Sequence, residues 1–437
     1  MKTVIKSNSF FSNIIAKQSV DINSKYKVSK YLITTEVDNG YLVYNTLFGD
    51  LFFLLQDEFK FLKSGKITCD VQRELVENRL LVKYDTEENQ VYSNYKDLIS
   101  AFKDSSFYNT FTILTTTDCN ARCYYCYQHG IEHNYMSETT ALKIADYIVK
   151  NSKGTVFLRW FGGEPLYNFN VINLICDYLK SNNISFVSSI ISNGLLFDDK
   201  NVSNAVEKWN LKKTQITLDG TRDVYNEIKN YINCEKSNAF DIVISNIKRL
   251  LNSDIQVNIR LNVGKNNIDD SKKLVEFIKD EFKNYDKINV YTALLYELRM
   301  QIDTDTHFSS KLIELDNMIF ESGLFTKKLS SDDLKKYNCI ADNPNSLLID
   351  PIGDFYKCEH IKTENRIGDI NKQDINGLII KEFCKNDILE ECNNCPLITK
   401  CNMLKLCQNH MSYCTQYKKQ HELSYTIFKM KNTYYNN

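Results

Sequence analysis

The chain has 437 residues, 43% of them hydrophobic, and its 54 basic residues nearly balance its 55 acidic residues, giving a formal net charge of −1. This length exceeds what one hydrophobic core usually organises, so we expect two or three domains. The near-neutral charge provides no field that favours nucleic acid or an anionic membrane, and neither is expected as a partner. The sequence has no secretion signal and no run of about 20 apolar residues that could span a bilayer. We therefore expect a cytoplasmic protein.

The 14 cysteines are unusual for such a chain. Because the cytosol keeps thiols reduced, they are expected to bind metal or carry out chemistry rather than form disulfides. Three scattered cysteines are interpreted as small buried hydrophobes. These are Cys69, Cys176 and Cys234.

The first 110 residues predict a hairpin followed by helices. The β-rich runs YLITTE and YLVYNT are joined by the turn Asp38-Asn39-Gly40, which is a hairpin signal. The segments GDLFFLLQDEFKFLKSG and DVQRELVENRLL then carry apolar residues at helical spacing, and the strand-like LVKY follows. We interpret residues 1–100 as a small winged-helix-like domain. A purely structural extension is the alternative.

A new pattern begins at Phe111, where six strand-like segments alternate with amphipathic helical stretches. One of these helices is predicted to begin at Ser137, a plausible N-cap residue. The alternation predicts a parallel sheet with right-handed crossovers, either barrel-like or doubly wound. The six predicted strands are 111–117, 155–160, 184–191, 214–219, 255–263 and 287–295.

Polar and glycine motifs follow the first five of these strands, each at its carboxyl end. Parallel strands present their carboxyl ends on one face, and βα barrels build their active sites there. The sequence therefore predicts that five motifs meet at one site. In chain order they are Cys119 to Cys126, Gly162-Gly163-Glu164-Pro165, Ser192-Asn193-Gly194, Asp219-Gly220, and Arg260 with Asn262.

The first motif, TTTDCNARCYYCYQHG, spaces three cysteines as C-x3-C-x2-C: Cys119, Cys123 and Cys126. Zinc is one candidate, because C-x2-C pairs commonly supply half of a tetrahedral site. A structural zinc site needs four ligands, however, and this motif offers three. An iron-sulfur cubane held by three thiolates would leave one iron open to another ligand.

The cysteine motif, GGEP, SNG and ITLDG, in this order, resemble the radical S-adenosylmethionine (SAM) superfamily over residues 111–295. The resemblance implies a radical SAM core at residues 105–300, folded as a partial (β/α)6 TIM-like barrel. It also implies that Cys119, Cys123 and Cys126 hold a [4Fe-4S] cluster whose fourth iron is chelated by the amino and carboxylate groups of SAM. Reductive cleavage of SAM would then give a 5′-deoxyadenosyl radical that removes a hydrogen atom from the substrate.

The resemblance further assigns residues to SAM. Gly162 and Gly163 would let the backbone approach the methionyl end, and Glu164 would accept a hydrogen bond from its ammonium group. Tyr125 matches the family's aromatic position near the adenine. The remaining three assignments compete with a structural role in capping or in strand-end hydrogen bonding. They are Ser192 and Asn193 for the ribose hydroxyls and Arg260 for the methionyl carboxylate.

The last quarter of the chain resembles the SPASM extension of radical SAM enzymes, at residues 330–425. The turn Gly353-x4-Cys358 and the spacing C-x2-C-x5-C match the family pattern, although the next interval is x5 where the family usually has x3. By resemblance, Cys392, Cys395, Cys401 and Cys414 bind one auxiliary [4Fe-4S] cluster. Cys339, Cys358 and Cys407 bind the other.

The auxiliary cluster assigned to Cys339, Cys358 and Cys407 lacks one expected ligand. The upstream cysteine that often completes it is absent, and Asp333 lies near its place. That cluster would keep an open iron or use Asp333 or Cys384. A zinc ribbon is the alternative for the C-x2-C segment. With the catalytic cluster, the resemblance implies three [4Fe-4S] clusters.

A SPASM extension on a radical SAM barrel resembles enzymes that modify peptides or proteins. We predict a ribosomal-peptide maturase that oxidatively cross-links a precursor peptide with a leader, with a thioether as the favoured bond. Its electron donor would be a flavodoxin or ferredoxin. The N-terminal module favours this reading, because YLVYNTLFGDLFFLLQDEF is similar to the start of leader-binding domains and sulfatase maturases begin close to the cluster motif. The hairpin, which is the wing of this winged-helix-like domain, would capture the leader peptide by strand addition.

Three alternatives remain. Two are an anaerobic sulfatase-maturing, formylglycine-forming enzyme and another protein-modifying radical SAM/SPASM enzyme. The third is a non-catalytic iron-sulfur electron carrier, which would not need GGEP, SNG and LDG at consecutive strand ends.

Overall fold

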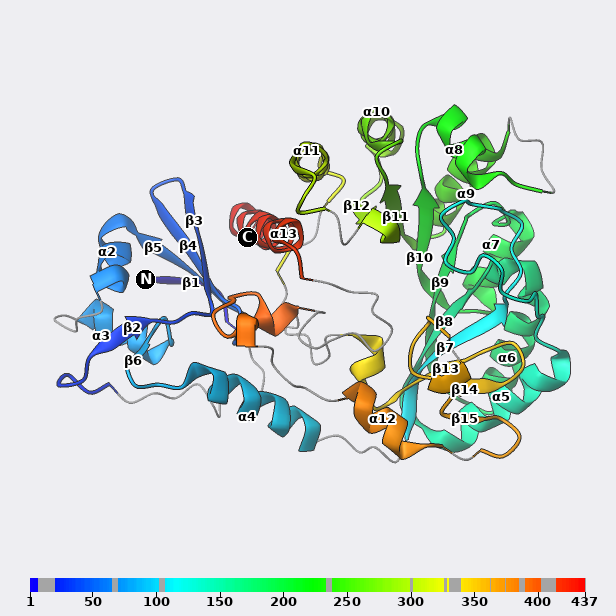
Figure 1. Cartoon of the computed structure of the whole chain (residues 1–437), viewed down its shortest axis with the longest axis horizontal. Helices are drawn as coiled ribbons and strands as arrows, with labels where there is room; N and C mark the ends of the chain where they lie inside the picture. Colours follow the sequence, from blue (N-terminus) through cyan, green and yellow to red (C-terminus); the bar gives the residue numbers. More distant parts are fainter. Residues whose placement is uncertain are drawn as a thin grey trace. The chain divides into compact units, whose positions relative to one another are not determined.

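The computed structural model forms two compact units (Figure 1). Unit 1 contains residues 1–104, 327–339 and 386–437, and unit 2 contains residues 105–326 and 340–385. The residues predicted to form one cysteine-rich domain therefore fall into both units. The structure describes residues 1–6, 20–64, 70–101, 107–232, 238–298, 302–325, 328–329, 339–361, 363–373, 375–384, 390–401 and 414–436.

Unit 1 contains a four-stranded antiparallel sheet in the order β1-β5-β4-β3. Its strands are β1 (Lys2–Ile5), β3 (Leu32–Val37), β4 (Gly40–Asn45) and β5 (Asp50–Leu55). The hairpin β3–β4 was predicted and is observed, with Val37 opposite Gly40 and Asn39 at a φ of 67° in the turn. Because β3 pairs only with β4 among the described strands, it is an edge of the sheet.

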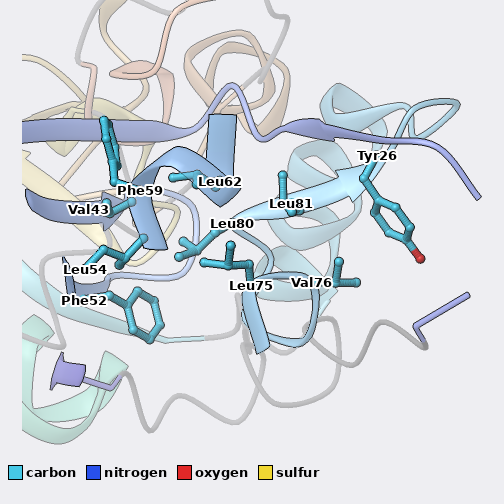
Figure 2. Packing of buried hydrophobic residues seen from close by; sticks show 10 residues of the cluster. All are labelled: Tyr26, Val43, Phe52, Leu54, Phe59, Leu62, Leu75, Val76, Leu80 and Leu81. Carbon is cyan, nitrogen blue, oxygen red and sulfur yellow. The ribbon is translucent and has the colours of Figure 1, made fainter. Parts of the chain in front are cut away.

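The prediction that Asp50–Leu55 forms part of a helix was wrong. This segment is strand β5, and most of its apolar residues are buried, with buried members on both faces of the sheet. Leu51 packs in one hydrophobic cluster, while Phe52 and Leu54 pack in another with α2 (Gln56–Ser64) and α3 (Asp70–Glu77) (Figure 2). A strand that is apolar on both faces has no polar alternation, so its sequence is easily mistaken for part of the following helix.

The other elements of unit 1 bring the two ends of the chain into one core. The helix α13 (Gln416–Tyr435) contributes Met430 to the cluster that contains Ile33 and Leu42, and Tyr434 stacks on Phe53 at 5.3 Å between ring centroids. The first hundred and the last twenty residues thus stabilise each other. The remaining elements are β2 (Tyr26–Val28), β6 (Leu81–Lys83), α4 (Glu88–Ala101) and the 3-10 turns η5 (Glu390–Cys392) and η6 (Ile398–Lys400).

Unit 2 is built on a nine-stranded sheet in the order β12-β11-β10-β9-β8-β7-β13-β14-β15. Every pairing from β12 to β13 is parallel, and β14 and β15 add an antiparallel end. The strands are β7 (Tyr108–Thr116), β8 (Ser152–Gly162), β9 (Phe186–Ser192), β10 (Leu211–Leu218), β11 (Gln256–Val263), β12 (Ile288–Leu294), β13 (Ser346–Ile349), β14 (Asp354–Tyr356) and β15 (Gly368–Asp369). The predicted α/β class with a parallel, partial-barrel sheet is confirmed.

Helices connect these strands, and α5, α6, α7 and α9 lie along one side of the sheet (Figure 1). The helix predicted to start at Ser137 is observed, because the Ser137 hydroxyl accepts a hydrogen bond from the Thr140 amide at 3.0 Å. The helices are α5 (Glu138–Asn151), α6 (Phe169–Ser181), α7 (Asp199–Glu207), α8 (Arg222–Lys229), α9 (Ala239–Asn252), α10 (Ile268–Phe282), α11 (Thr306–Glu321) and α12 (Gly377–Cys384). Shorter 3-10 turns are η1 (Pro165–Asn168), η2 (Tyr296–Leu298), η3 (Ile340–Asp342) and η4 (Thr363–Asn365).

The two faces of this sheet differ in burial. Along β9 the pattern alternates strictly, with Phe186, Ser188 and Ile190 buried and the residues between them partly exposed. The buried set packs under the helices, so the partly exposed set lines the opposite face. No helix in the described part of the chain is long and apolar enough to cross a membrane.

Candidate active site

The three cysteines of the C-x3-C-x2-C motif lie in the loop that follows β7. Cys119 and Cys123 are partly buried and Cys126 is exposed. The Cys119 sulfur accepts a hydrogen bond from the Ala121 amide at 3.4 Å, and the Cys126 amide donates to the Cys123 carbonyl at 3.2 Å. Burial is the main cause that raises the pKa of Cys119, to about 12.

Cys119 would therefore be a thiolate at neutral pH only beside a cation such as iron. In the described residues no group of three or more Cys, His, Asp and Glu side chains is already arranged to hold a metal ion. Three soft thiols in one loop fit an iron-sulfur cluster by the chemistry of the donor set.

The two glycines at the end of β8, Gly162 and Gly163, hold the start of this loop. Gly163 donates its amide to the Thr116 carbonyl at 3.0 Å, and Glu164 donates its amide to the Asp118 carbonyl at 2.9 Å. A Cβ on Gly162, whose φ is +132°, would lie 2.1 Å from the Thr116 carbonyl oxygen, and one on Gly163 would lie 2.2 Å from that of Asp118. Glycine is thus required for the close approach of β8 to the cysteine loop. The predicted contact of these glycines with SAM stays a prediction.

Glu164 joins the ends of β8 and β9. Its buried carboxylate accepts hydrogen bonds from the Ser192 hydroxyl at 2.9 Å, the Asn193 amide at 2.8 Å and the Leu166 amide at 3.1 Å. Burial raises the pKa of Glu164 to about 7, more than these three donors lower it. The carboxylate that was assigned to the ammonium group of SAM therefore also orders two strand ends.

Asn193 continues this connection to the first cysteine. Its side-chain amide donates to the Asn120 side-chain oxygen at 2.6 Å and lies 3.7 Å from the Cys119 sulfur. The structure thus brings the GGEP, SNG and cysteine motifs together. The proposed contacts of Ser192 and Asn193 with the ribose stay predictions.

A second network connects the cysteine loop to β10 and β11. The Tyr125 hydroxyl donates to the Asp219 carboxylate at 2.7 Å, and the Lys229 ammonium lies 2.9 Å from the same carboxylate. The Asn262 side chain donates to the Tyr125 hydroxyl at 3.0 Å and accepts from the Arg260 guanidinium at 2.9 Å. Tyr125, which was assigned to the adenine, is therefore anchored by its hydroxyl to the ends of two further strands.

The ion pair in this network is buried. The side chains of Lys229 and Asp219 are 4% and 0% exposed, respectively. Burial opposes the charge of Lys229, but attraction to Asp219 overcomes it and holds the pKa of Lys229 well above its usual value. Burial, with the Asp219 charge, raises the pKa of Tyr125 well above its usual value.

Lys229 was not predicted from the sequence. It lies on α8 four positions after Tyr225, which is also buried, so it occupies the inward face of that helix. A lysine at an inward position of a helix that directly follows LDG is the signal that could have identified it.

Part of the predicted tail motif lies in unit 1. Cys392 and Cys401 are partly buried beside Ile398, and the Cys395 amide donates to the Cys392 carbonyl at 3.0 Å. The segment is tied to β4 and the turn after it, because the Thr46 hydroxyl donates to the Pro396 carbonyl at 2.7 Å.

The other tail cysteines are more dispersed along the described chain. Cys339 and Cys414 are exposed in unit 1, and Cys358 is partly buried in unit 2. Cys407 and Asp333 lie outside the described residues, as do Cys69 and Cys234, whereas Cys176 is fully buried as predicted. The assignment of tail cysteines to two auxiliary clusters stays a prediction.

Comparison with known proteins agrees with this arrangement. Residues 113–278 match the family described as the radical SAM superfamily. Residues 113–278 therefore form a radical SAM domain, and enzymes of that superfamily use a [4Fe-4S] cluster and SAM.

Individual relatives extend beyond that domain. The chain is 23% identical over 426 residues to the radical SAM cyclopropyl synthase TigE of Paramaledivibacter caminithermalis, covering 85% of this chain and 84% of that protein. It is 26% identical over 325 residues to the cysteine-type anaerobic sulfatase-maturating enzyme of Clostridium novyi, covering 67% and 85%. Among solved structures, native anSMEcpe with bound AdoMet and Kp18Cys peptide superimposes with a TM-score of 0.58 at 17% identity, covering 75% of this chain and all of that one.

Proposed function

We propose that this enzyme modifies a peptide or protein, and that Cys119, Cys123 and Cys126 hold its catalytic [4Fe-4S] cluster. The observation that supports this most is the hydrogen bonding that connects the cysteine loop to the GGEP and SNG motifs through Asn193 and Glu164. When bound, the cluster supplies the electron that cleaves SAM.

The chain's own residues have two tasks in this proposal. Asn193 and the Ala121 amide orient the Cys119 sulfur. The Asp219–Lys229 pair fixes Tyr125, which precedes Cys126 directly in the sequence, so the third cysteine is held relative to the first. Fixed donors around the Cys119 sulfur keep it in one geometry.

Replacement of the three cysteines by alanine tests the cluster assignment. Reduced, reconstituted wild-type enzyme should release 5′-deoxyadenosine from SAM, and the triple variant should not. Iron retained by the triple variant would support clusters at the tail and argue against a zinc ribbon there. Cys176→Ala is the matched control, because this cysteine is fully buried away from the loop. Release of 5′-deoxyadenosine by the triple variant would refute the assignment, and no release by the wild type would favour an electron carrier.

For the substrate, we propose a ribosomally made precursor peptide whose cysteine sulfur is joined to a carbon atom. This rests on the resemblance of the tail to SPASM and on relatives named as a cyclopropyl synthase and a sulfatase-maturating enzyme. One hydrogen atom would leave the acceptor carbon for the 5′-deoxyadenosyl group, and closure of the carbon–sulfur bond would release the thiol proton and one electron. The auxiliary clusters that we propose at the tail cysteines would accept that electron.

Mass spectrometry of the precursor after incubation with enzyme, SAM and reductant tests this proposal. The expected product has lost two hydrogens per cross-link, and its cysteine no longer reacts with iodoacetamide. Deuterium gained from solvent at an otherwise unchanged mass would indicate epimerisation instead. A cysteine converted to an aldehyde would indicate a sulfatase-maturing enzyme.

We further propose that the leader adds to β3, the edge strand of the unit 1 sheet. Deletion of residues 1–100 is a poor test, because these residues share a core with α13. Point variants are sharper. The backbone amides of adjacent residues in a strand point to opposite edges of that strand. One of the variants Thr34→Pro and Thr35→Pro therefore removes a hydrogen bond to β4, and the other removes a hydrogen-bond donor to the leader. A variant that keeps its thermal stability but binds the leader at least tenfold more weakly would support the proposal, and equal leader affinity for both variants would refute it.

A further inference from the structure

The face of the unit 2 sheet opposite the helices carries two cations in one row. In the parallel register Arg159 on β8 pairs with Ser189 on β9, and Ser189 pairs with Lys213 on β10. Residues paired in this way point to the same face. All three are partly exposed, whereas their neighbours Leu158 and Ile190 are buried.

The hydrogen-bond network of Tyr125, Asn262 and Arg260 at the cysteine loop reaches the same face of the sheet. The Tyr291 hydroxyl on β12 donates to the Gln215 side chain on β10 at 2.5 Å, so these two side chains share a face. Tyr291 pairs in register with Arg260, and Gln215 lies two positions after Lys213. Arg260, Lys213 and Arg159 therefore line one face.

Neither Arg159 nor Lys213 has an ion-pair partner within the described parts of the chain. Burial, with the nearby charge of Arg159, lowers the pKa of Lys213. Burial raises the pKa of Tyr291 and the nearby charge of Glu359 adds to this shift, yet Glu359 forms no salt bridge with either cation in the described structure. Two like charges on one partly buried face favour an anion between them.

The two cations lie at a defined distance from the end of β8 that carries Gly162. Arg159 precedes Gly162 by three residues on β8, which corresponds to about 10 Å at about 3.3 Å per residue. An extended peptide spans the same distance with about three residues. An anionic side chain three residues from the reacting position could thus reach the two cations.

We propose that Arg159 and Lys213 bind a side-chain carboxylate, from Asp or Glu, of the peptide substrate. The proposal rests on the proposed function, because it identifies one recognition element of the same substrate. Arginine and lysine both form charge-assisted hydrogen bonds with carboxylates, so a neutral amide in the same place binds more weakly.

Affinity selection from a defined peptide pool tests this. The probe is a mixture of nonapeptides with a central cysteine and randomised flanks, acetylated and amidated at their ends so that side chains carry the only carboxylates. Holoenzyme with SAM should enrich peptides with Asp or Glu about tenfold over those with Asn or Gln. The double variant R159Q/K213Q should lose this preference. Lys212→Gln is the matched control, because Lys212 is exposed and adjacent on the same strand.

Several results would overturn the inference. They are no acidic preference in the wild type, an undiminished preference in R159Q/K213Q, or the same loss in Lys212→Gln. A tenfold loss of SAM affinity in R159Q/K213Q would reassign the cations to the carboxylate of SAM. Failure of the proposed function is seen separately, as absence of 5′-deoxyadenosine release by the wild type.

Discussion

The buried ion pair between Asp219 and Lys229 gives the sharpest energetic prediction. At 2.9 Å the two charges attract each other by about 6 kcal/mol at an effective dielectric constant of about 20. Desolvation offsets much of this attraction, but removal of one partner leaves the other charge buried and unpaired. We therefore expect Lys229→Met or Asp219→Asn to lower the free energy of unfolding by about 3–5 kcal/mol. The double variant should lose less than the sum of the two, with a coupling energy of about 2 kcal/mol.

Urea unfolding of the iron-free protein, followed by tryptophan fluorescence, measures the unfolding free energy of unit 2, which contains the ion pair. The chain has two tryptophans, Trp160 and Trp209, and both are buried in unit 2. The control is the exposed pair of Lys208 and Asp177, 3.6 Å apart, whose disruption should change the unfolding free energy by less than about 1 kcal/mol. Single-variant losses below about 1 kcal/mol, or strictly additive losses, would refute the reasoning.

Three further predictions concern the same unit. Gly162→Ala should lower the unfolding free energy by about 3 kcal/mol or more and reduce iron incorporation, because its Cβ would clash with the Thr116 carbonyl oxygen. The control is Gly154→Ala, which is also at positive φ but has no atom near its Cβ, and it should lower the unfolding free energy by about 1–2 kcal/mol. Similar losses in the two variants would contradict the clash. Because the folded pKa of Glu164 is raised from 4.5 to about 7, its contribution to stability is complete below pH 4.5 and declines as the pH rises toward 7. The wild type should therefore lose about 2 kcal/mol relative to Glu164→Gln between pH 5 and 7, and parallel pH profiles would count against this. Ser137→Ala should lower the unfolding free energy by about 1 kcal/mol through loss of the α5 cap, and an unchanged urea midpoint would contradict it.

The sequence predicts the structure best where a single physical rule determines where residues lie. The motifs at Cys119, Gly162 and Ser192 could be expected to meet, because parallel strands align their carboxyl ends. The strand Asp50–Leu55 was missed because burial on both faces removes the alternation that identifies a strand. Lys229 was missed because its partner Asp219 is ten positions away and the pairing depends on the turn between them.

The packing of the chain ends could not be predicted at all. No local pattern indicates that Met430 contacts the cluster around Ile33, since this contact joins residues almost 400 positions apart and depends on the tertiary fold.

This long-range packing has a consequence for how the protein is made. Residues 105–326 form most of unit 2 as one continuous stretch, so the barrel can fold while the ribosome is still translating. Unit 1 cannot complete its core until α13 leaves the ribosome, which at about 5–20 residues per second is tens of seconds after its first strands emerge. During that interval the apolar face of β3, β4 and β5 that packs against α13 is uncovered, and chaperones that bind nascent chains are expected to engage the N-terminal segment before the rest of the protein.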